Sequence, residues 1–180
     1  MYLPSEDSLL LAESVKQYTG KSALEIGVGS GIILKILHDN FKIVAGTDVH
    51  IMSLKYCKDN LPNDIMLACC DAASVFHYRF DLIVSNPPYL PIENHKTKDY
   101  AINGGSRGIE MTLHFIRSGI SILDIKGKML IISSNLSDTT ELEEYISEMN
   151  LKKTIIKERK LFFETLQSIE ISFEWFILLF

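Results

Sequence analysis

Apolar residues in this chain alternate between strand-like and helix-like spacing along most of its length, and no other feature limits the fold as strongly. Short runs rich in branched apolar residues are mostly separated by segments in which apolar residues recur every three or four positions. Strands joined through helices pair in parallel and are covered on both faces. The pattern therefore predicts a doubly wound α/β fold, with strands at residues 22–28, 42–48, 64–71, 80–86 and 127–135.

The C-terminal part breaks this alternation. Residues 152–160 and 168–180 are strand-like, and the segment between them is too short for a crossover helix. We expect them to pair as an antiparallel hairpin that completes the sheet. Neither a repeat nor a linker divides the 180 residues, so a single domain spanning residues 1–180 is expected.

Glycine and polar residues stand where four of the predicted strands end. The segment EIGVGSG (25–31) follows the first strand, and Asp48, Asp71 and Asn86 follow the next three. Taken singly, each could be a tight structural turn or a helix cap. The carboxyl ends of parallel strands share one edge, however, so together these residues predict a single ligand site. We expect a nucleoside-bearing ligand there, with its ribose at Asp48 and its adenine near Asp71 and Ala72.

The fourth strand runs directly into Asn86-Pro87-Pro88-Tyr89. Asn86 offers a side-chain carbonyl acceptor, and Pro87 offers a backbone carbonyl with no N–H beside it, while Pro88 stiffens the segment. Two acceptors can hold both hydrogens of a planar NH2 group and direct its nitrogen lone pair at an electrophile. Tyr89 would stack on the planar group. The alternative is a proline-stiffened turn with a surface tyrosine.

Composition narrows the possible partners and location. The net charge of -5 provides no basic surface for nucleic acid. The three cysteines and five histidines show no metal-ligand spacing, so we expect no metal site and a reducing compartment. Residues 1–7 lack the character of a signal peptide, and the apolar residues 172–180 are too few to span a bilayer, which needs about 20. We therefore expect a cytoplasmic protein that does not cross a membrane.

Several of these motifs resemble one family. EIGVGSG together with NPPY is similar to the S-adenosylmethionine-dependent methyltransferases that modify amide or exocyclic nitrogens. YLPSEDSLLL (2–11) and DYAINGGSRGIE (99–110) resemble the short eukaryotic and archaeal branch of the HemK-type protein glutamine-N5 methyltransferases. The resemblance implies a class I methyltransferase fold, a Rossmann-like, seven-stranded, mostly parallel sheet with a C-terminal antiparallel hairpin.

The same resemblance implies an activity and its residues. The enzyme would methylate the glutamine of the Gly-Gly-Gln motif in a translation release factor, leaving S-adenosylhomocysteine as the second product. Ser8 would lie at the carboxylate end of the cofactor, although it could equally be a hydroxyl in the first turn of a helix. Asn86, Pro87 and Tyr89 would hold the glutamine amide, with Pro88 beside them. The cofactor residues would be Ser8, Glu25, Gly27, Gly29, Gly31, Asp48, Asp71, Ala72 and Asn86.

The resemblance also implies a partner. Members of the short branch commonly pair with a small zinc-binding activator protein along the edge of the sheet. Residues 65–70 would be that edge here. Because they carry no charge, they would be prone to pair with other chains and aggregate if the edge were left uncovered. The alternative is that loops of the same chain cover this strand.

Other activities fit part of the pattern. Adenine-N6 methylation of nucleic acid would use the same acceptors, and a lysine methyltransferase is a further possibility. An inactive binding module would not need the Asn86 and Pro87 acceptors. An NAD-dependent oxidoreductase is disfavoured because Ile32 stands where the dinucleotide pattern has glycine.

Overall fold

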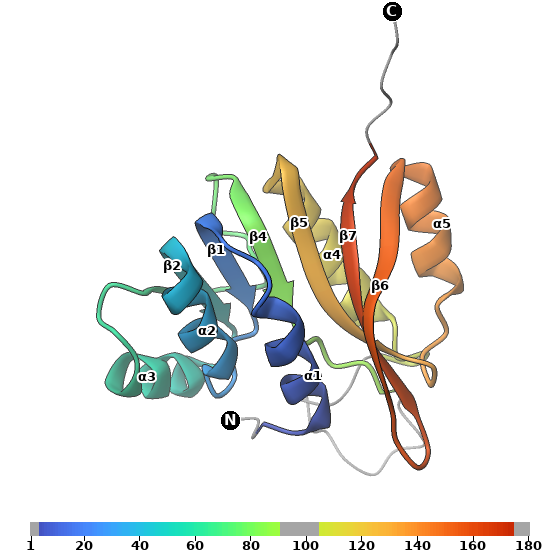
Figure 1. Ribbon diagram of the computed structural model, residues 1–180, viewed down its shortest axis with the longest axis horizontal. Helices are drawn as coiled ribbons and strands as arrows, with labels where there is room; N and C mark the ends of the chain where they lie inside the picture. Colours follow the sequence, from blue (N-terminus) through green and yellow to red (C-terminus); the bar gives the residue numbers. More distant parts are fainter. Residues whose placement is uncertain (1–3, 91–104, 175–180) are drawn as a thin grey trace, which may run out of the picture.

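A computed structural model of the chain describes residues 4–90 and 105–174 (Figure 1). Seven strands form one sheet in the order β3-β2-β1-β4-β5-β7-β6. The first five strands are parallel, and β7 is antiparallel to both β5 and β6. The predicted class I architecture, including the antiparallel hairpin, is therefore confirmed. The strands are β1 (Gly20–Ile26), β2 (Phe41–Asp48), β3 (Met66–Cys69), β4 (Phe80–Ser85), β5 (Leu123–Ser134), β6 (Leu151–Lys160) and β7 (Thr165–Phe173).

The strand bounds differ from the prediction most clearly in β5. It begins at Leu123, whereas residue 127 was expected, because Phe80 of β4 already pairs with Leu123. The register then shifts, and Leu82 pairs with Lys128. Gly127 lies inside this irregular part, where an added Cβ would come within 2.9 Å of two backbone oxygens. Gly127 therefore lies at an irregularity within β5 and does not begin the strand.

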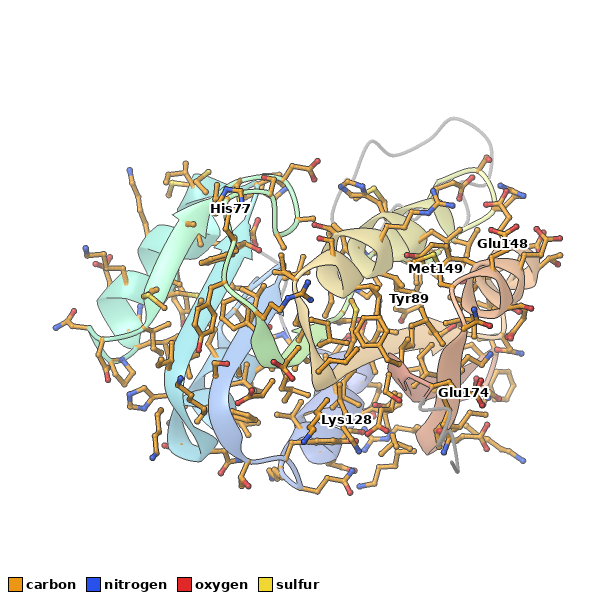
Figure 2. All side chains as sticks on the ribbon, turned by 90° about the horizontal axis from the view of Figure 1, so that it is seen from above. His77, Tyr89, Lys128, Glu148, Met149 and Glu174 are labelled. Atoms are coloured by element: carbon orange, nitrogen blue, oxygen red, sulfur yellow. The ribbon has the colours of Figure 1, made fainter. Side chains whose placement is uncertain are left out.

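Helices cover both faces of the sheet, as the apolar runs of the strands require. They are α1 (Glu6–Val15), α2 (Ile32–Asn40), α3 (Ile51–Asn60), α4 (Glu110–Ser121) and α5 (Thr140–Glu148). One core contains residues of α1, α2 and α3, and the other contains residues of α4 and α5. Within β4, Ile83 belongs to the second core while Leu82 and Val84 belong to the first, as alternation along a strand dictates. Seen from above, α4 and α5 lie together on one face (Figure 2).

Some predictions fall on residues that the structure does not describe. The last predicted strand reached residue 180, whereas β7 ends at Phe173 and residues 175–180 lie outside the described part. Residues 2 and 3 of YLPSEDSLLL and residues 99–104 of the glycine-rich segment also lie outside it. Among the described residues, no helix is long and apolar enough to cross a membrane.

Candidate functional site

The loop after β1 holds its ligand-facing shape through backbone hydrogen bonds to β2. The N–H groups of Gly27 and Val28 both donate to the Thr47 carbonyl, at 2.8 and 3.0 Å. Gly27 and Gly29 have φ values of 79° and 47°, a left-handed conformation in which glycine is favoured. Gly31 also has a left-handed φ, 75°, but it packs away from the cavity described below. A Cβ there would come 2.9 Å from the Cys57 Sγ atom.

Asp48, at the end of β2, holds this loop from the other side. Its Oδ2 atom accepts a hydrogen bond from the Gly29 N–H at 3.1 Å, and its Oδ1 atom accepts one from the His50 N–H at 2.8 Å. The side chain thus bridges the glycine loop and the start of α3. Asp48 therefore caps local backbone, as expected if it were only a helix cap, but it also lines the cavity.

Glu25 is a buried carboxyl group beside this loop. Its side chain is nearly inaccessible, and the Oε2 atom has no hydrogen-bond partner among the described residues. Burial raises the pKa of Glu25 well above its ordinary value, and the nearby charge of Asp48 raises it further. A carboxylate at this position would be stabilised by a cationic group of a ligand.

Asp71 and Ala72 follow β3 at the same edge. The Asp71 Oδ1 atom lies 2.7 Å from Nε2 of His114, which α4 contributes. Ala72 is buried and has a φ of 44°, an uncommon value for a residue with a side chain. This turn brings Ala72 under the cavity while Asp71 stays largely exposed at its margin.

The Asn86 side chain carries the most informative atom of the site. The residue lines the cavity. Its Oδ1 atom is buried and has no hydrogen-bond partner among the described residues, while its Nδ2 atom donates to Ser8 Oγ at 3.5 Å. Within residues 4–90 and 105–174, no recorded hydrogen bond engages the Pro87 carbonyl. A purely structural turn would be expected to satisfy these acceptors with its own backbone. The arrangement instead leaves an acceptor available to a ligand.

Asp7 is a site residue that the sequence reasoning missed. It is buried at the start of α1, where its Oδ1 atom accepts hydrogen bonds from Ser5 Oγ at 2.6 Å and from Ser8. Its Oδ2 atom accepts a hydrogen bond from the Tyr89 hydroxyl at 3.3 Å. Asp7 therefore joins α1 to the segment after β4. The residue stands within YLPSEDSLLL, but only the tertiary contact with Tyr89 distinguishes it from a helix-capping acid.

A second contact fixes the backbone of Tyr89. Ser137 lies between β5 and α5 and donates its hydroxyl to the Tyr89 carbonyl at 2.7 Å. Tyr89 is thus held at both its hydroxyl and its backbone. Nothing in the sequence around Ser137 indicated this contact.

These elements line an open cavity of about 890 Å³, within the range of small-molecule and cofactor sites. Met111 and Phe115 of α4 form part of its wall, a contribution that the sequence reasoning also missed. Among the described residues, no group of three His, Cys, Asp or Glu side chains is placed to hold a metal ion. With the exception of Gly31, every predicted site residue lines the cavity: Ser8, Glu25, Gly27, Gly29, Asp48, Asp71, Ala72, Asn86, Pro87, Pro88 and Tyr89.

The strand order and the cavity at the carboxyl edge define a methyltransferase of class I architecture. The chain belongs to the family described as Methyltransferase small domain, which matches residues 6–162. The predicted methyltransferase class is therefore confirmed. Individual relatives have names that specify the group they methylate.

One curated relative is MJ0928 of Methanocaldococcus jannaschii, which is named for protein N5-glutamine methylation. It is 31% identical over 177 residues, covering 94% of this chain and 90% of the relative. A release factor glutamine methyltransferase of Bradyrhizobium diazoefficiens is 38% identical over 74 residues, which cover 37% of this chain and 25% of that relative.

Solved structures agree with the fold. The chain superposes on a chain of the E. cuniculi Mtq2-Trm112 complex, described as responsible for methylating the eRF1 translation termination factor. The TM-score is 0.77 and the identity 25%, with 96% of this chain and 98% of that chain covered. A ribosomal protein L11 methylase from Lactobacillus delbrueckii, at 20% identity and a TM-score of 0.70, shares the fold, with 95% of this chain and 81% of that chain covered.

Proposed function

We propose that this protein transfers the methyl group of S-adenosylmethionine to the side-chain nitrogen N5 of the glutamine in the Gly-Gly-Gln motif of a translation release factor. The observation that carries the proposal is the buried, unpartnered Oδ1 atom of Asn86, a residue that lines the cavity. Such an atom is costly to keep unless a ligand donates to it. A release factor substrate places the activity in the cytoplasm.

The residues of the cavity fit the proposed cofactor. Glu25 presents a buried carboxyl oxygen without a partner, which suits the ammonium group of the methionine part. The backbone of Gly27 and Gly29 allows close approach of that part, with Ser8 at its carboxylate end. Asp48 would meet the ribose, and the turn at Asp71 and Ala72 would lie beside the adenine. When bound, the cofactor supplies a methyl group on a positively charged sulfur.

The glutamine amide would be held by the segment after β4. Asn86 Oδ1 and the Pro87 carbonyl accept its two N–H hydrogens, so the nitrogen lone pair faces the methyl carbon. With the cofactor bound, the N–C bond would form as the C–S bond breaks, sulfur would keep the electron pair, and the amide nitrogen would release one proton to solvent. Tyr89, fixed by Asp7 and Ser137, stacks against the planar amide, and Pro88 stiffens the segment.

Adenine-N6 methylation is the second candidate, because an adenine amino group is also a planar NH2. A ribosomal RNA small subunit methyltransferase C of Haemophilus ducreyi is 34% identical over 94 residues, which cover 48% of this chain and 28% of that relative, and its name points to RNA but not to adenine. The net charge of -5 favours a protein substrate over a polyanion. A lysine amine, the third possibility, gains less from two acceptors arranged for a planar group.

The edge of the sheet at β3 supports an activator partner. Met66–Cys69 contains no charged residue, and Met66 is 47% exposed, so this edge is available to another strand. The related structure contains Mtq2 in a complex with Trm112. We infer that a small activator protein pairs along β3 in the same region.

The proposed function is tested by mass spectrometry of a release factor incubated with the protein and isotopically labelled S-adenosylmethionine. We expect one labelled methyl group on the side-chain nitrogen of the Gly-Gly-Gln glutamine. A release factor with that glutamine replaced by glutamate is the control and should stay unlabelled. Label on a lysine of the release factor, or on adenine of RNA in a parallel incubation, with none on the glutamine, would favour the rival activities.

A further inference from the structure

The turn between β6 and β7 carries two exposed phenylalanines. Phe162 is 91% exposed and Phe163 is 84% exposed. Their rings meet edge to face, with centroids 4.6 Å apart. Hairpin turns are normally made of glycine, asparagine, aspartate or proline, so neither ring is explained by turn geometry or by the core. We call Phe162 and Phe163 the aromatic pair.

The aromatic pair lies at the same edge of the sheet as the candidate site. Because β7 runs antiparallel to β5, Leu166 at its start pairs with Ser134 at the carboxyl end of β5. Figure 1 shows the β6–β7 turn projecting at the end of the molecule toward which the arrowhead of β4 points. Any macromolecule that inserts a side chain at Asn86 must lie across this edge.

Hydrogen bonds fix the turn relative to the site. The Leu161 N–H donates to the Glu164 carbonyl at 2.8 Å and closes the turn. Thr165 and Asn135 are joined twice, by the Thr165 N–H to Asn135 Oδ1 at 2.6 Å and by the Asn135 N–H to the Thr165 carbonyl at 3.1 Å. Two residues after Asn135, Ser137 donates to the Tyr89 carbonyl. The aromatic pair is therefore held at a set position relative to Asn86 and Pro87, the proposed acceptors for the glutamine amide.

The charges near the turn suit a protein better than a nucleic acid. Arg159 of β6 is engaged by Glu6 and Glu13 of α1, each at 2.7 Å, and Lys157 also contacts Glu13, at 3.0 Å. These two cations are neutralised by carboxylates of the same chain. Lys160, next to the turn, has no ion pair among the described residues, but a single lysine is a weak site for phosphates. An exposed apolar pair beside them is the kind of anchor that protein interfaces use.

We propose that the aromatic pair is a docking contact for the protein substrate and inserts into an apolar surface of the release factor beside its Gly-Gly-Gln loop. This inference rests on the proposed function. It adds a second attachment point, outside the cavity, that a short peptide carrying only the motif would not reach. Its loss should therefore weaken capture of the intact factor without altering the cavity.

The experiment compares methyl transfer to the intact release factor and to a short Gly-Gly-Gln peptide. The double variant Phe162→Ala/Phe163→Ala should raise KM for the intact factor about tenfold or more. Transfer to the peptide should change by less than about twofold, because a contact outside the cavity does not reach it. The control Ile125→Ala removes another exposed apolar side chain, 54% exposed near the opposite end of β5, and should leave both KM values unchanged.

A second double variant separates apolar docking from stacking. Phe162→Leu/Phe163→Leu keeps the apolar surface and should hold KM for the intact factor within about threefold of wild type, whereas base stacking needs aromatic rings. An unchanged KM in the alanine variant would overturn the inference. The inference would also be overturned if the alanine variant kept wild-type kinetics with the release factor but bound single-stranded RNA more weakly. The same holds if it kept those kinetics but lost self-association, measured by sedimentation. If the wild-type protein labels no glutamine at all, the proposed function fails first and this inference falls with it.

Discussion

At the scale of single residues, three residues that line the cavity each carry a buried side-chain oxygen. Glu25 Oε2, Thr47 Oγ1 and Asn86 Oδ1 have no hydrogen-bond partner among the described residues. Leaving such an atom unsatisfied costs about 1–3 kcal/mol, more for a charge. Most buried polar groups in folded proteins are satisfied, so three unpartnered oxygens on residues of one cavity favour a site that a ligand completes.

At Glu25 the raised pKa predicts a pH dependence of the ligand-free protein. Burial favours the protonated carboxyl in the folded state, while the unfolded chain keeps the ordinary pKa of 4.5. The stability that this group contributes is fully present below pH 4.5 and is lost as the pH rises through the raised folded pKa. Glu25→Gln cannot ionise, so its stability should fall less over this range. Urea unfolding at a series of pH values measures the difference.

The exposed residue Glu148 provides the control for this measurement. Glu148→Gln should keep the wild-type pH profile of the unfolding free energy. Identical profiles for wild type and Glu25→Gln would show that the buried carboxyl does not titrate in this way.

At the scale of elements, the site depends on how closely α2 and the glycine loop pack on β2. Gly46 pairs with Glu25 across the sheet. A Cβ at Gly46 would lie 2.5 Å from Val28 Cγ1 and 3.0 Å from two methyl carbons of Leu34. The absence of a side chain in β2 therefore lets the loop and the start of α2 approach the sheet.

Gly46→Ala should push Val28 and the glycine loop outward. We expect a loss of about 1–3 kcal/mol in the free energy of unfolding, as for other overpacked core positions, together with weaker cofactor binding. Urea unfolding and calorimetry measure the two effects. Gly119→Ala in α4 is the matched control, because its Cβ would meet the flexible end of Met129, at 2.9 Å, and alanine is favoured over glycine in a helix. Equal losses in the two variants would rule out this packing argument.

The elements also show what the sequence can and cannot predict. Asp48, Asp71 and Asn86 could be placed at one edge because parallel strands put all their carboxyl ends together. The early start of β5 could not be predicted, since it depends on pairing with Phe80 across a register shift. Asp7 escaped notice because its contact with Tyr89 joins residues 82 positions apart, and no local pattern encodes such a contact.

At the scale of the whole molecule, the two edges of the sheet differ in character. The β6 edge carries charged side chains along LKKTIIKERK, which discourage pairing with another strand. The β3 edge, MLAC, carries none. This difference favours β3 as the edge that accepts a partner.

The cysteines test this assignment. Cys57 is fully buried, and burial, followed by the charges of Glu25 and Asp48, raises its pKa to about 11, so it should resist alkylation in the folded protein. Cys69, at the end of β3, is exposed and should react at least about tenfold faster. Mass spectrometry of the alkylated protein gives the rates. An activator on β3 should protect Cys69, and undiminished labelling of Cys69 in the complex would exclude that edge as the interface.

The central claim is that Asn86 and Pro87 hold a planar NH2 group beside the methyl donor. Single-turnover methyl transfer by Asn86→Ala tests it most directly, with cofactor affinity measured in parallel by calorimetry. We expect transfer to the release factor to fall by about a hundredfold or more, while cofactor affinity stays within about tenfold of wild type. The exposed Asn60→Ala variant should match wild type in both measurements. Transfer by Asn86→Ala at the wild-type rate would contradict the account.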